Sequence, residues 1–255
     1  MIVVIAKNQL LIPFGASRLT ARAVEALGTT DGGYSVRCSV PHAVIRRDDL
    51  DALRLNDAPY DFSRRAVPRE PSGETDPLSL LQTRIADLCG LWGKPARRWV
   101  SCYFEFISAQ VELHRELLTR RLEGFGGLYN YRDWIYSALA PLPRAWIPIS
   151  PGEAPTPATL LPADFAFWSG KSMVAVFLTG LETPTAGYRE RTRRLRASGT
   201  QVVEVPAESV KSGDQSRLGA LLPACFERFW EGEPFPSGPF RASRFGNIEL
   251  AETRE

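Results

Sequence analysis

The pattern of apolar and polar positions predicts an α/β protein that begins with a small N-terminal α/β unit over residues 1–65. Short apolar runs bounded by polar residues are typical of strands, and apolar residues spaced three or four apart are typical of helices. Gly28 follows one such helical pattern and is a common helix stop. The predicted elements are a β-hairpin over Ile2–Ala6 and Leu10–Phe14, a helix over Leu19–Leu27, a strand over Tyr34–Val40 and a short helix over 48–55.

A charged stretch with several prolines, residues 66–77, is the predicted linker to the rest of the chain. Beyond it, the spacing of apolar residues predicts three helices. Seven prolines between residues 140 and 162 exclude a helix there and are compatible only with an edge strand, Trp146–Ile149. The predicted helices cover Leu78–Leu91, Trp99–Glu123 and Trp134–Leu139, and residues 231–255 form a tail.

Within a predicted core over residues 78–230, residues 160–210 indicate a mixed sheet flanked by helices. Three apolar runs rich in β-branched side chains predict strands, and a basic segment closed by Gly199 predicts a helix between the last two. A strand, a hairpin partner, a helix and a further strand in this order are typical of a mixed α/β sheet with a crossover. The strands cover Ala163–Trp168, Met173–Leu178 and Gln201–Val205, and the helix covers Tyr188–Ser198.

The overall composition excludes several classes of protein but indicates no ligand. A hydrophobic content of 44% excludes a fully disordered, collagen-like or coiled-coil chain. The net charge of +2 gives no global attraction to nucleic acid. No apolar run is long enough to span a bilayer, and the apolar N-terminus lacks the basic flank of a signal peptide. The four cysteines and two histidines lack metal-site spacing. We therefore expect a cytoplasmic protein with no membrane association and no small-molecule cofactor.

Local charge differs from this total, because five arginines are concentrated in the predicted basic helix. They are Arg189, Arg191, Arg193, Arg194 and Arg196. At about 100° per residue, Arg189, Arg193 and Arg196 share one face. The inward stripe consists of Tyr188, Thr192 and Leu195. Guanidinium groups at this density repel one another unless anions are near, so the helix predicts contact with nucleic-acid phosphates, with an acidic protein partner or with neighbouring acids of the chain.

Three motifs follow one another around this helix. Asp164 stands near the head of its strand in Leu161–Ala166, an apolar strand then ends at Thr179, and the basic helix leads into the strand that ends at Pro206. In this order the motifs resemble the core of the PD-(D/E)XK, or restriction-endonuclease-like, superfamily, most closely its very-short-patch-repair-like branch. The resemblance covers roughly residues 105–210 and implies a nuclease-type fold in which paired carboxylates hold Mg²⁺.

The chain departs from this superfamily at the catalytic positions. Where the resemblance implies an acid-x-Lys pair, the chain has Phe177 and Thr179, so the implied active site is degenerate. Asp164 alone is too little to hold a hydrated Mg²⁺ ion. An active enzyme would need a carboxylate from another element. Its candidate residues are Asp164 as metal ligand, Glu190 or else Glu182 as the displaced acid, Glu116 as the third carboxylate, and Lys171 or else Arg193 as the cation.

Three functions follow from these observations. The first is a catalytically degenerate nuclease-like protein, which binds nucleic acid through the five arginines or scaffolds a nucleic-acid-processing complex such as a bacterial defence or mobile-element complex. Such a protein would be a pseudo-nuclease without a cofactor. The second is a divergent Mg²⁺-dependent endonuclease that uses Asp164. The third is a protein-interaction subunit that does not contact nucleic acid, which the near-neutral charge favours.

Overall fold

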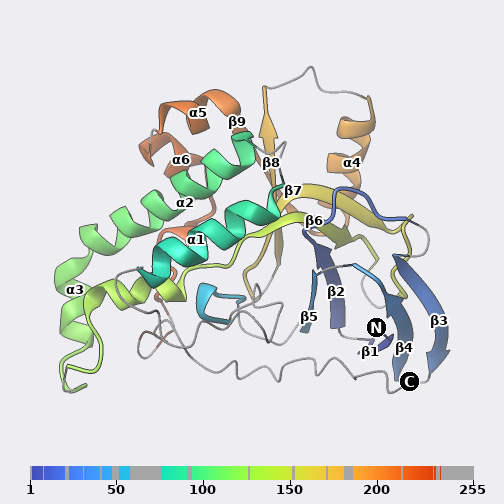
Figure 1. Cartoon of the computed structure of the whole chain (residues 1–255), viewed down its shortest axis with the longest axis horizontal. Helices are drawn as coiled ribbons and strands as arrows, with labels where there is room; N and C mark the ends of the chain where they lie inside the picture. The colour runs from blue at the N-terminus through green and yellow to red at the C-terminus, as the bar shows by residue number, and fades with distance from the viewer. Residues whose placement is uncertain are drawn as a thin grey trace.

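The computed structural model has an α/β fold, as the sequence predicts (Figure 1). A four-stranded mixed sheet stands at its centre, with helices against it and a group of N-terminal strands beside it. The structure describes residues 2–7, 9–20, 23–30, 32–40, 42–47, 52–57, 76–90, 94–125, 127–150, 153–170, 172–180, 186–213, 215–231, 233 and 236.

The central sheet has the strand order β6-β7-β8-β9. The first two pairings are antiparallel, and β8 pairs parallel with β9, which requires the long connection that helix α4 provides. The predicted strand–strand–helix–strand order is therefore confirmed. The proline-flanked strand β6 lies at the edge of this sheet, where prolines remove few ladder bonds. The bounds are Leu142–Pro148 for β6, Leu160–Trp168 for β7, Met173–Thr179 for β8, Ala186–Ala197 for α4 and Gln201–Pro206 for β9.

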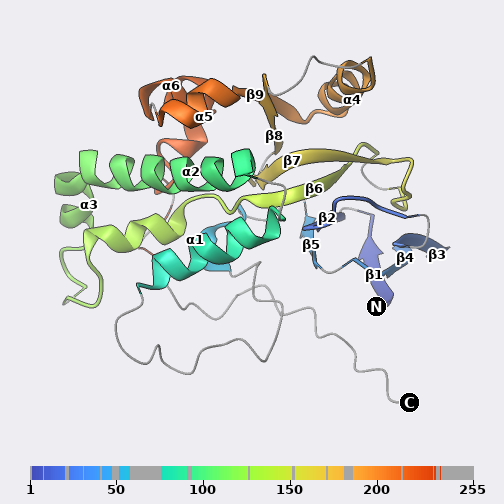
Figure 2. The same cartoon turned by 45° about the horizontal axis from the view of Figure 1, so that its top comes forward.

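Helices lie against both faces of this sheet (Figures 1 and 2). Phe165 pairs with Val176, so Phe165 and Phe177 point to opposite faces. The Phe165 ring packs on Trp99 of α2, with centroids 4.2 Å apart, and Phe177 packs on Tyr188 of α4 at 5.5 Å. The remaining helices are α1 (Pro77–Leu88), α2 (Lys94–Leu113), α3 (Arg115–Arg121), α5 (Ala207–Ser212) and α6 (Gln215–Leu221), with 3₁₀ turns at Leu55–Asp57, Tyr131–Ser137 and Ala224–Phe226.

Aromatic rings of α2 pack against those of β7, the strand that carries Asp164. The buried rings are Trp99, Tyr103, Phe165, Phe167 and Phe226. Phe167 lies 5.5 Å from Tyr103 and 4.8 Å from Phe226, measured between ring centroids. The Tyr103 hydroxyl donates to the Leu139 carbonyl at 2.6 Å, which satisfies its polar end inside the core.

The single long helix predicted over 99–123 is wrong, because the structure has two helices there. α2 ends at Leu113, and His114 has φ −104° and ψ 19° before α3 begins. The His114 ring packs on Trp230, with centroids 4.8 Å apart, and its Nδ1 lies 2.9 Å from the Gln110 carbonyl oxygen. A tertiary contact with the C-terminal segment therefore accompanies the break, and the continuous apolar spacing gave no sign of it.

Two predictions for the N-terminal unit are also wrong. The hairpin does not form: β1 pairs with β4 and β2 with β5, and the Ala6 amide donates to the Gln9 side chain at 2.8 Å. The helix over 19–27 is also wrong from Val24 onward, where the chain forms strand β3, which pairs with β4 and buries Val24, and residues 21 and 22 lie outside the described residues. Nine residues of helical spacing stabilise little on their own, so sheet pairing outweighs them. The strands are β1 (Ile2–Ala6), β2 (Gln9–Phe14), β3 (Val24–Thr30), β4 (Gly33–Cys38, the strand predicted over 34–40) and β5 (His42–Arg47).

Several predicted boundaries fall partly outside the described residues. Of the short helix predicted over 48–55, the structure describes residues 52–55, where the prediction is wrong: Arg54 forms a β-bridge with Leu139, and a 3₁₀ turn begins at Leu55. Of the linker 66–77, the structure describes Asp76 and Pro77. The Asp76 carboxylate accepts hydrogen bonds from the first turn of α1, and Pro77 is its first residue, which is a favourable start for a helix.

The Arg54 side chain connects the C-terminal segment to the core through hydrogen bonds and an ion pair. Its Nη1 donates to the carbonyl oxygens of Ser137 and, at 2.7 Å, Phe229, and its Nη2 lies 2.9 Å from Glu233 Oε1. Both charged side chains are mostly buried, with 14% and 19% of their surface exposed. The segment predicted as a tail from residue 231 is thus held by the core as far as Glu233.

Replacing Arg54 by Met is expected to lower the free energy of unfolding by about 2 kcal/mol, because Glu233 and two carbonyl groups lose their partner in a poorly solvated place. Chemical denaturation measures the difference. The matched control is Arg228→Ala, which removes an exposed ion pair with Glu231 and is expected to cost less than about 0.5 kcal/mol. Equal losses in the two variants would contradict this role of Arg54.

Candidate functional site

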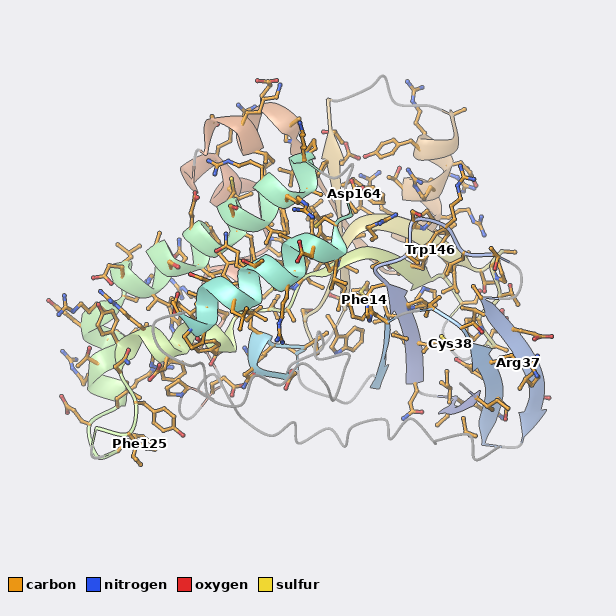
Figure 3. The ribbon with its side chains drawn as sticks, viewed as in Figure 1. Phe14, Arg37, Cys38, Phe125, Trp146 and Asp164 are labelled. Carbon is orange, nitrogen blue, oxygen red and sulfur yellow. The ribbon has the colours of Figure 1, made fainter. Side chains whose placement is uncertain are left out.

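Asp164 lies at a fork between two strands of the sheet (Figure 3). β7 and β8 pair from Phe165 with Val176 to Trp168 with Met173, and this pairing stops before Asp164. At that point the Asp164 Oδ2 accepts a hydrogen bond of 2.8 Å from the Leu178 amide. The side chain of Asp164 therefore takes the place of a backbone ladder bond across the opening strands.

The register of the sheet places four residues in one row. β6 and β7 pair on both sides of Arg144 and Asp164, so these two stand opposite each other. The β7–β8 register, continued by one residue, brings Phe177 beside Asp164, and Phe177 pairs with Glu204 of β9. Each of the four strands thus contributes one residue to the row that contains Asp164.

The surroundings of Asp164 act on its charge in opposite directions. The side chain still reaches solvent, but protein atoms crowd around the carboxylate, and this desolvation raises the pKa of Asp164. The hydrogen bond from Leu178 and the positive charge of Arg191 on α4 lower the pKa by a smaller amount. Asp164 is consequently a carboxylate for which the ionised form is less favoured than in water.

The two positions at which the resemblance implies an acid and a Lys hold no charge. Phe177 is buried, and its ring packs edge-on against Tyr188, with the Arg191 guanidinium 5.4 Å from the ring centroid. Burial, with Glu204 nearby, raises the pKa of Tyr188 to about 12. Thr179 is half-buried at the end of β8. An aromatic cluster beneath α4 therefore lies where the resemblance implies a second metal-binding carboxylate.

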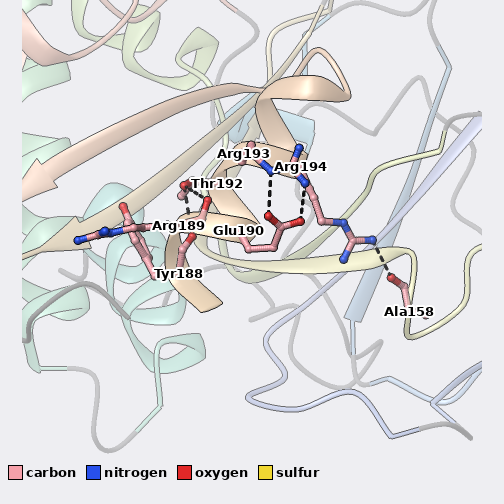
Figure 4. Close-up of polar contacts among 7 residues, drawn as sticks. All are labelled: Ala158, Tyr188, Arg189, Glu190, Thr192, Arg193 and Arg194. Carbon is pink, nitrogen blue, oxygen red and sulfur yellow. Dashed lines mark hydrogen bonds and ion pairs between the residues drawn. The ribbon is translucent and has the colours of Figure 1, made fainter. Parts of the chain in front are cut away.

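The structure does not bring the other candidate catalytic residues to Asp164. Glu190 is exposed on α4 and forms two hydrogen bonds with Arg193, of 2.7 and 2.8 Å, which lower the pKa of Glu190 (Figure 4). Glu116 is exposed on α3, at the opposite end of the molecule from α4 in both views (Figures 1 and 2). Lys171 and Glu182 lie outside the described residues. Among the residues that are described, no three His, Cys, Asp or Glu side chains are grouped to hold a metal ion.

The basic helix has the two faces that its spacing predicts. Thr192 and Leu195 are buried and Tyr188 is half-buried, whereas three arginines are exposed. The exposed arginines are Arg189, Arg193 and Arg196.

Nearby acids neutralise only part of this charge. Arg193 pairs with Glu190, and Arg196 pairs with Glu204 at 3.1 Å. The Arg189 side chain points away from Glu190 and has no hydrogen-bond or ion-pair partner within the described part of the chain (Figure 4).

The two remaining arginines of α4 are half-buried. Arg194 donates to the Ala158 carbonyl at 3.3 Å (Figure 4). Arg191 lies over the rings of Phe177 and Tyr188, at 5.4 and 5.7 Å from their centroids, and its Nε is buried without a hydrogen-bond partner. Cation–π contact holds the Arg191 guanidinium at the inner side of the helix, next to Asp164.

The sequence did not indicate that Arg144 stands beside the candidate site. It stands opposite Asp164 on β6, and its backbone has a positive φ of 50°. Neither feature has a sequence signal, because the register of β6 on β7 is a tertiary property and arginine does not favour positive φ.

Comparison of the chain with protein families, curated proteins and solved structures found no match. Within the part of the chain that the structure describes, no helix combines the length and the apolar character needed to cross a membrane. The interpretation of the site therefore depends on its own geometry.

Asp164→Asn is expected to raise the melting temperature at neutral pH and to leave it unchanged in acid. Asn keeps an oxygen that accepts from the Leu178 amide but removes the desolvated charge. Because folding raises the pKa of Asp164, its protonated form stabilises the fold below the ordinary value of 3.8, and this contribution is lost as pH rises through the folded pKa. Thermal denaturation across the acidic to neutral range measures the difference.

The companion variant Asp164→Ala removes the acceptor as well and is expected to cost about 1 kcal/mol, because the Leu178 amide loses its bond. An Asn variant that is no more stable than the Ala variant at neutral pH would show that the hydrogen bond across the fork contributes nothing.

Proposed function

We propose that this chain is a nuclease-like protein that binds nucleic acid through α4 and does not cleave it. The observation that carries the proposal is a buried aromatic cluster at the fork, where the resemblance implies a second carboxylate. Phe177 lies beneath Tyr188 and Arg191, next to an Asp164 whose carboxylate is bound by a backbone amide. Mg²⁺-dependent phosphodiester cleavage needs several oxygen ligands held close together, and Asp164 alone supplies too few.

The charge on α4 supports binding. The helix carries five arginines, and the acids paired with them are Glu190 and Glu204, which leaves an excess of three positive charges on one short helix and its neighbouring strand. Guanidinium groups bind backbone phosphates through forked hydrogen bonds, and the release of counterions makes such binding strongly dependent on salt. The ion pairs of Arg193 and Arg196 with these acids are exposed and cost little to exchange for phosphate contacts.

A protein-interaction subunit within a larger nucleic-acid-processing complex is the second candidate. It is favoured by three exposed leucines near the end of the molecule opposite α4: Leu113, Leu117 and Leu128, which are 75%, 43% and 80% exposed. Exposed apolar side chains on neighbouring segments offer a surface for contact with a partner. This surface and the basic helix lie apart, so a scaffold that uses both is compatible with the fold (Figure 1).

Fluorescence anisotropy with single- and double-stranded DNA and RNA oligonucleotides tests the binding. We expect affinity that falls steeply with salt, and a triple variant Arg189→Ala/Arg193→Ala/Arg196→Ala whose salt slope is smaller by about 2 to 3, one for each lost phosphate contact. The matched control is Arg115→Ala/Arg120→Ala/Arg228→Ala, which removes the same charge from exposed positions on other elements. Binding that ignores salt, or an equal loss in the control, would contradict the proposal.

A cleavage assay tests the second half of the proposal. Incubation of the same oligonucleotides with the chain and Mg²⁺ or Mn²⁺ is expected to give no product, and Asp164→Asn is expected to behave as the parent. Metal-dependent cleavage that disappears in Asp164→Asn would establish the divergent nuclease instead.

A further inference from the structure

Strand β1 is an edge strand whose outward side chains are apolar. In the sheet of order β1-β4-β3 it pairs with β4, and within the described residues no strand pairs with its other edge. Ile5 is buried in a cluster with Leu11 and Leu160, whereas Ile2 and Val4 on the opposite face are 62% and 69% exposed. An apolar strand with an open edge is a template on which a further strand can pair.

The outer edges of the other described strands carry features that hinder such pairing. Prolines remove ladder bonds, charged side chains resist burial, and a bulge bends the strand. β3 has a register shift between Ala26 and Gly28. β1 contains no charge, proline, glycine or register shift, so its edge is unprotected. The hindering residues are Glu25 in β3, Pro143 and Pro148 in β6, Glu204 and Pro206 in β9, Pro13 in β2, and Arg46 and Arg47 in β5.

The backbone of β1 has unused hydrogen-bonding groups at two residues. The Lys7 amide donates to the turn before β4 at 3.1 Å. Because the groups of an antiparallel strand alternate between its two edges, the amides and carbonyls of Ile2, Val4 and Ala6 face outward. The Ala6 amide donates to the Gln9 side chain at 2.8 Å. The open groups on this edge are therefore those of Ile2 and Val4.

We propose that β1 pairs antiparallel with β1 of a second copy of this chain, about a twofold axis at Val3. In this register Ile2 of each copy lies opposite Val4 of the other, so the open amide and carbonyl of each residue gain a partner. The interface uses the same residues on both copies and closes on itself, which gives a dimer with one continuous sheet. The proposal does not depend on the proposed function.

The side chains of this sheet also fit a second copy. Ile2 and Val4 are β-branched, and cross-strand pairs of such apolar side chains stabilise a sheet. A twofold axis brings like groups together, so charges on β1 would repel one another, but β1 carries none. Arg37 is the β4 neighbour of Ile2 and pairs with Glu25 at 2.8 Å, which neutralises it. A charged partner strand would find no opposite charge on β1.

The size and place of the interface predict how the dimer behaves. One strand edge is a small interface, so we expect association that increases with protein concentration, not a permanent dimer. β1 and α4 lie apart in both views, so pairing through β1 leaves α4 open (Figures 1 and 2). The dimer would thus present two basic helices.

Sedimentation velocity of the full chain, treated with nuclease and measured from micromolar to millimolar concentration, tests the pairing. The parent is expected to convert from monomer to dimer. Val4→Lys places a charge on the paired edge and is expected to raise the dissociation constant of the dimer about tenfold or more. The matched control is Leu27→Lys, which adds the same charge at a 41% exposed position on β3, the other edge strand of this sheet. This control is expected to dimerise as the parent does.

A disulfide between copies tests the register. Ile2→Cys and Val4→Cys are each prepared with Cys225→Ser, because Cys225 is the exposed one of the four native cysteines. Directly opposite residues of a hydrogen-bonded antiparallel pair have Cα atoms about 5.5 Å apart, which a disulfide can span. Under mild oxidation the mixture is expected to give a disulfide between the two variants, in higher yield than either variant gives alone.

Each outcome supports or overturns the pairing. A parent that stays monomeric at every concentration overturns it, as does a dimer that is equally stable in Val4→Lys or equally weakened in Leu27→Lys. Species larger than a dimer overturn the twofold arrangement, and a monomer that binds an extended peptide through β1 overturns the second copy as occupant. If Val4→Lys is less stable than the parent, the cysteine mixture decides: the mixed disulfide supports the pairing, and its absence contradicts it.

Discussion

The hydrogen bond from the Leu178 amide to the Asp164 carboxylate is the contact on which the candidate site depends. β7 and β8 stop pairing next to Asp164, and this bond joins them across the opening. It holds Asp164 in the row between Arg144 and Phe177 and turns one carboxylate oxygen toward the protein. A carboxylate used in this way, beside a buried aromatic ring, is better suited to fixing the strands than to holding a metal ion.

The arrangement of arginines on α4 supports the proposed binding function over catalysis. On the exposed face of α4, Arg193 forms an ion pair with Glu190, and Arg196 forms one with Glu204 of β9. These exposed pairs order the arginine side chains and contribute little free energy that a phosphate would have to replace. On the inner side of α4, the Arg191 Nε is buried without a hydrogen-bond partner, and the positive charge of Arg191 acts on Asp164. Several arginines on one helix suit a ligand that carries regularly spaced phosphates, because several weak contacts then act together.

The order of elements over residues 160–210 could be predicted because each element has its own periodicity and a clear stop, such as Gly199 after the basic helix. The two faces of α4 followed from the same spacing. The β3 strand, the break at His114 and the conformation of Arg144 could not be predicted, because each depends on a tertiary partner: β4, Trp230 and β7. Asp164 was recognisable as a candidate residue, whereas its amide partner and the arginine opposite it become visible only with the sheet register.

Amide hydrogen exchange with and without a bound oligonucleotide tests the central claim most directly, because it reports where along the chain the ligand lies. The account predicts slower exchange in α4 and at the fork, the Leu178 amide included, with no change in α3. Protection confined to α3 and the exposed leucines near it, or no protection anywhere, would contradict the claim that nucleic acid binds across α4 and the Asp164 fork.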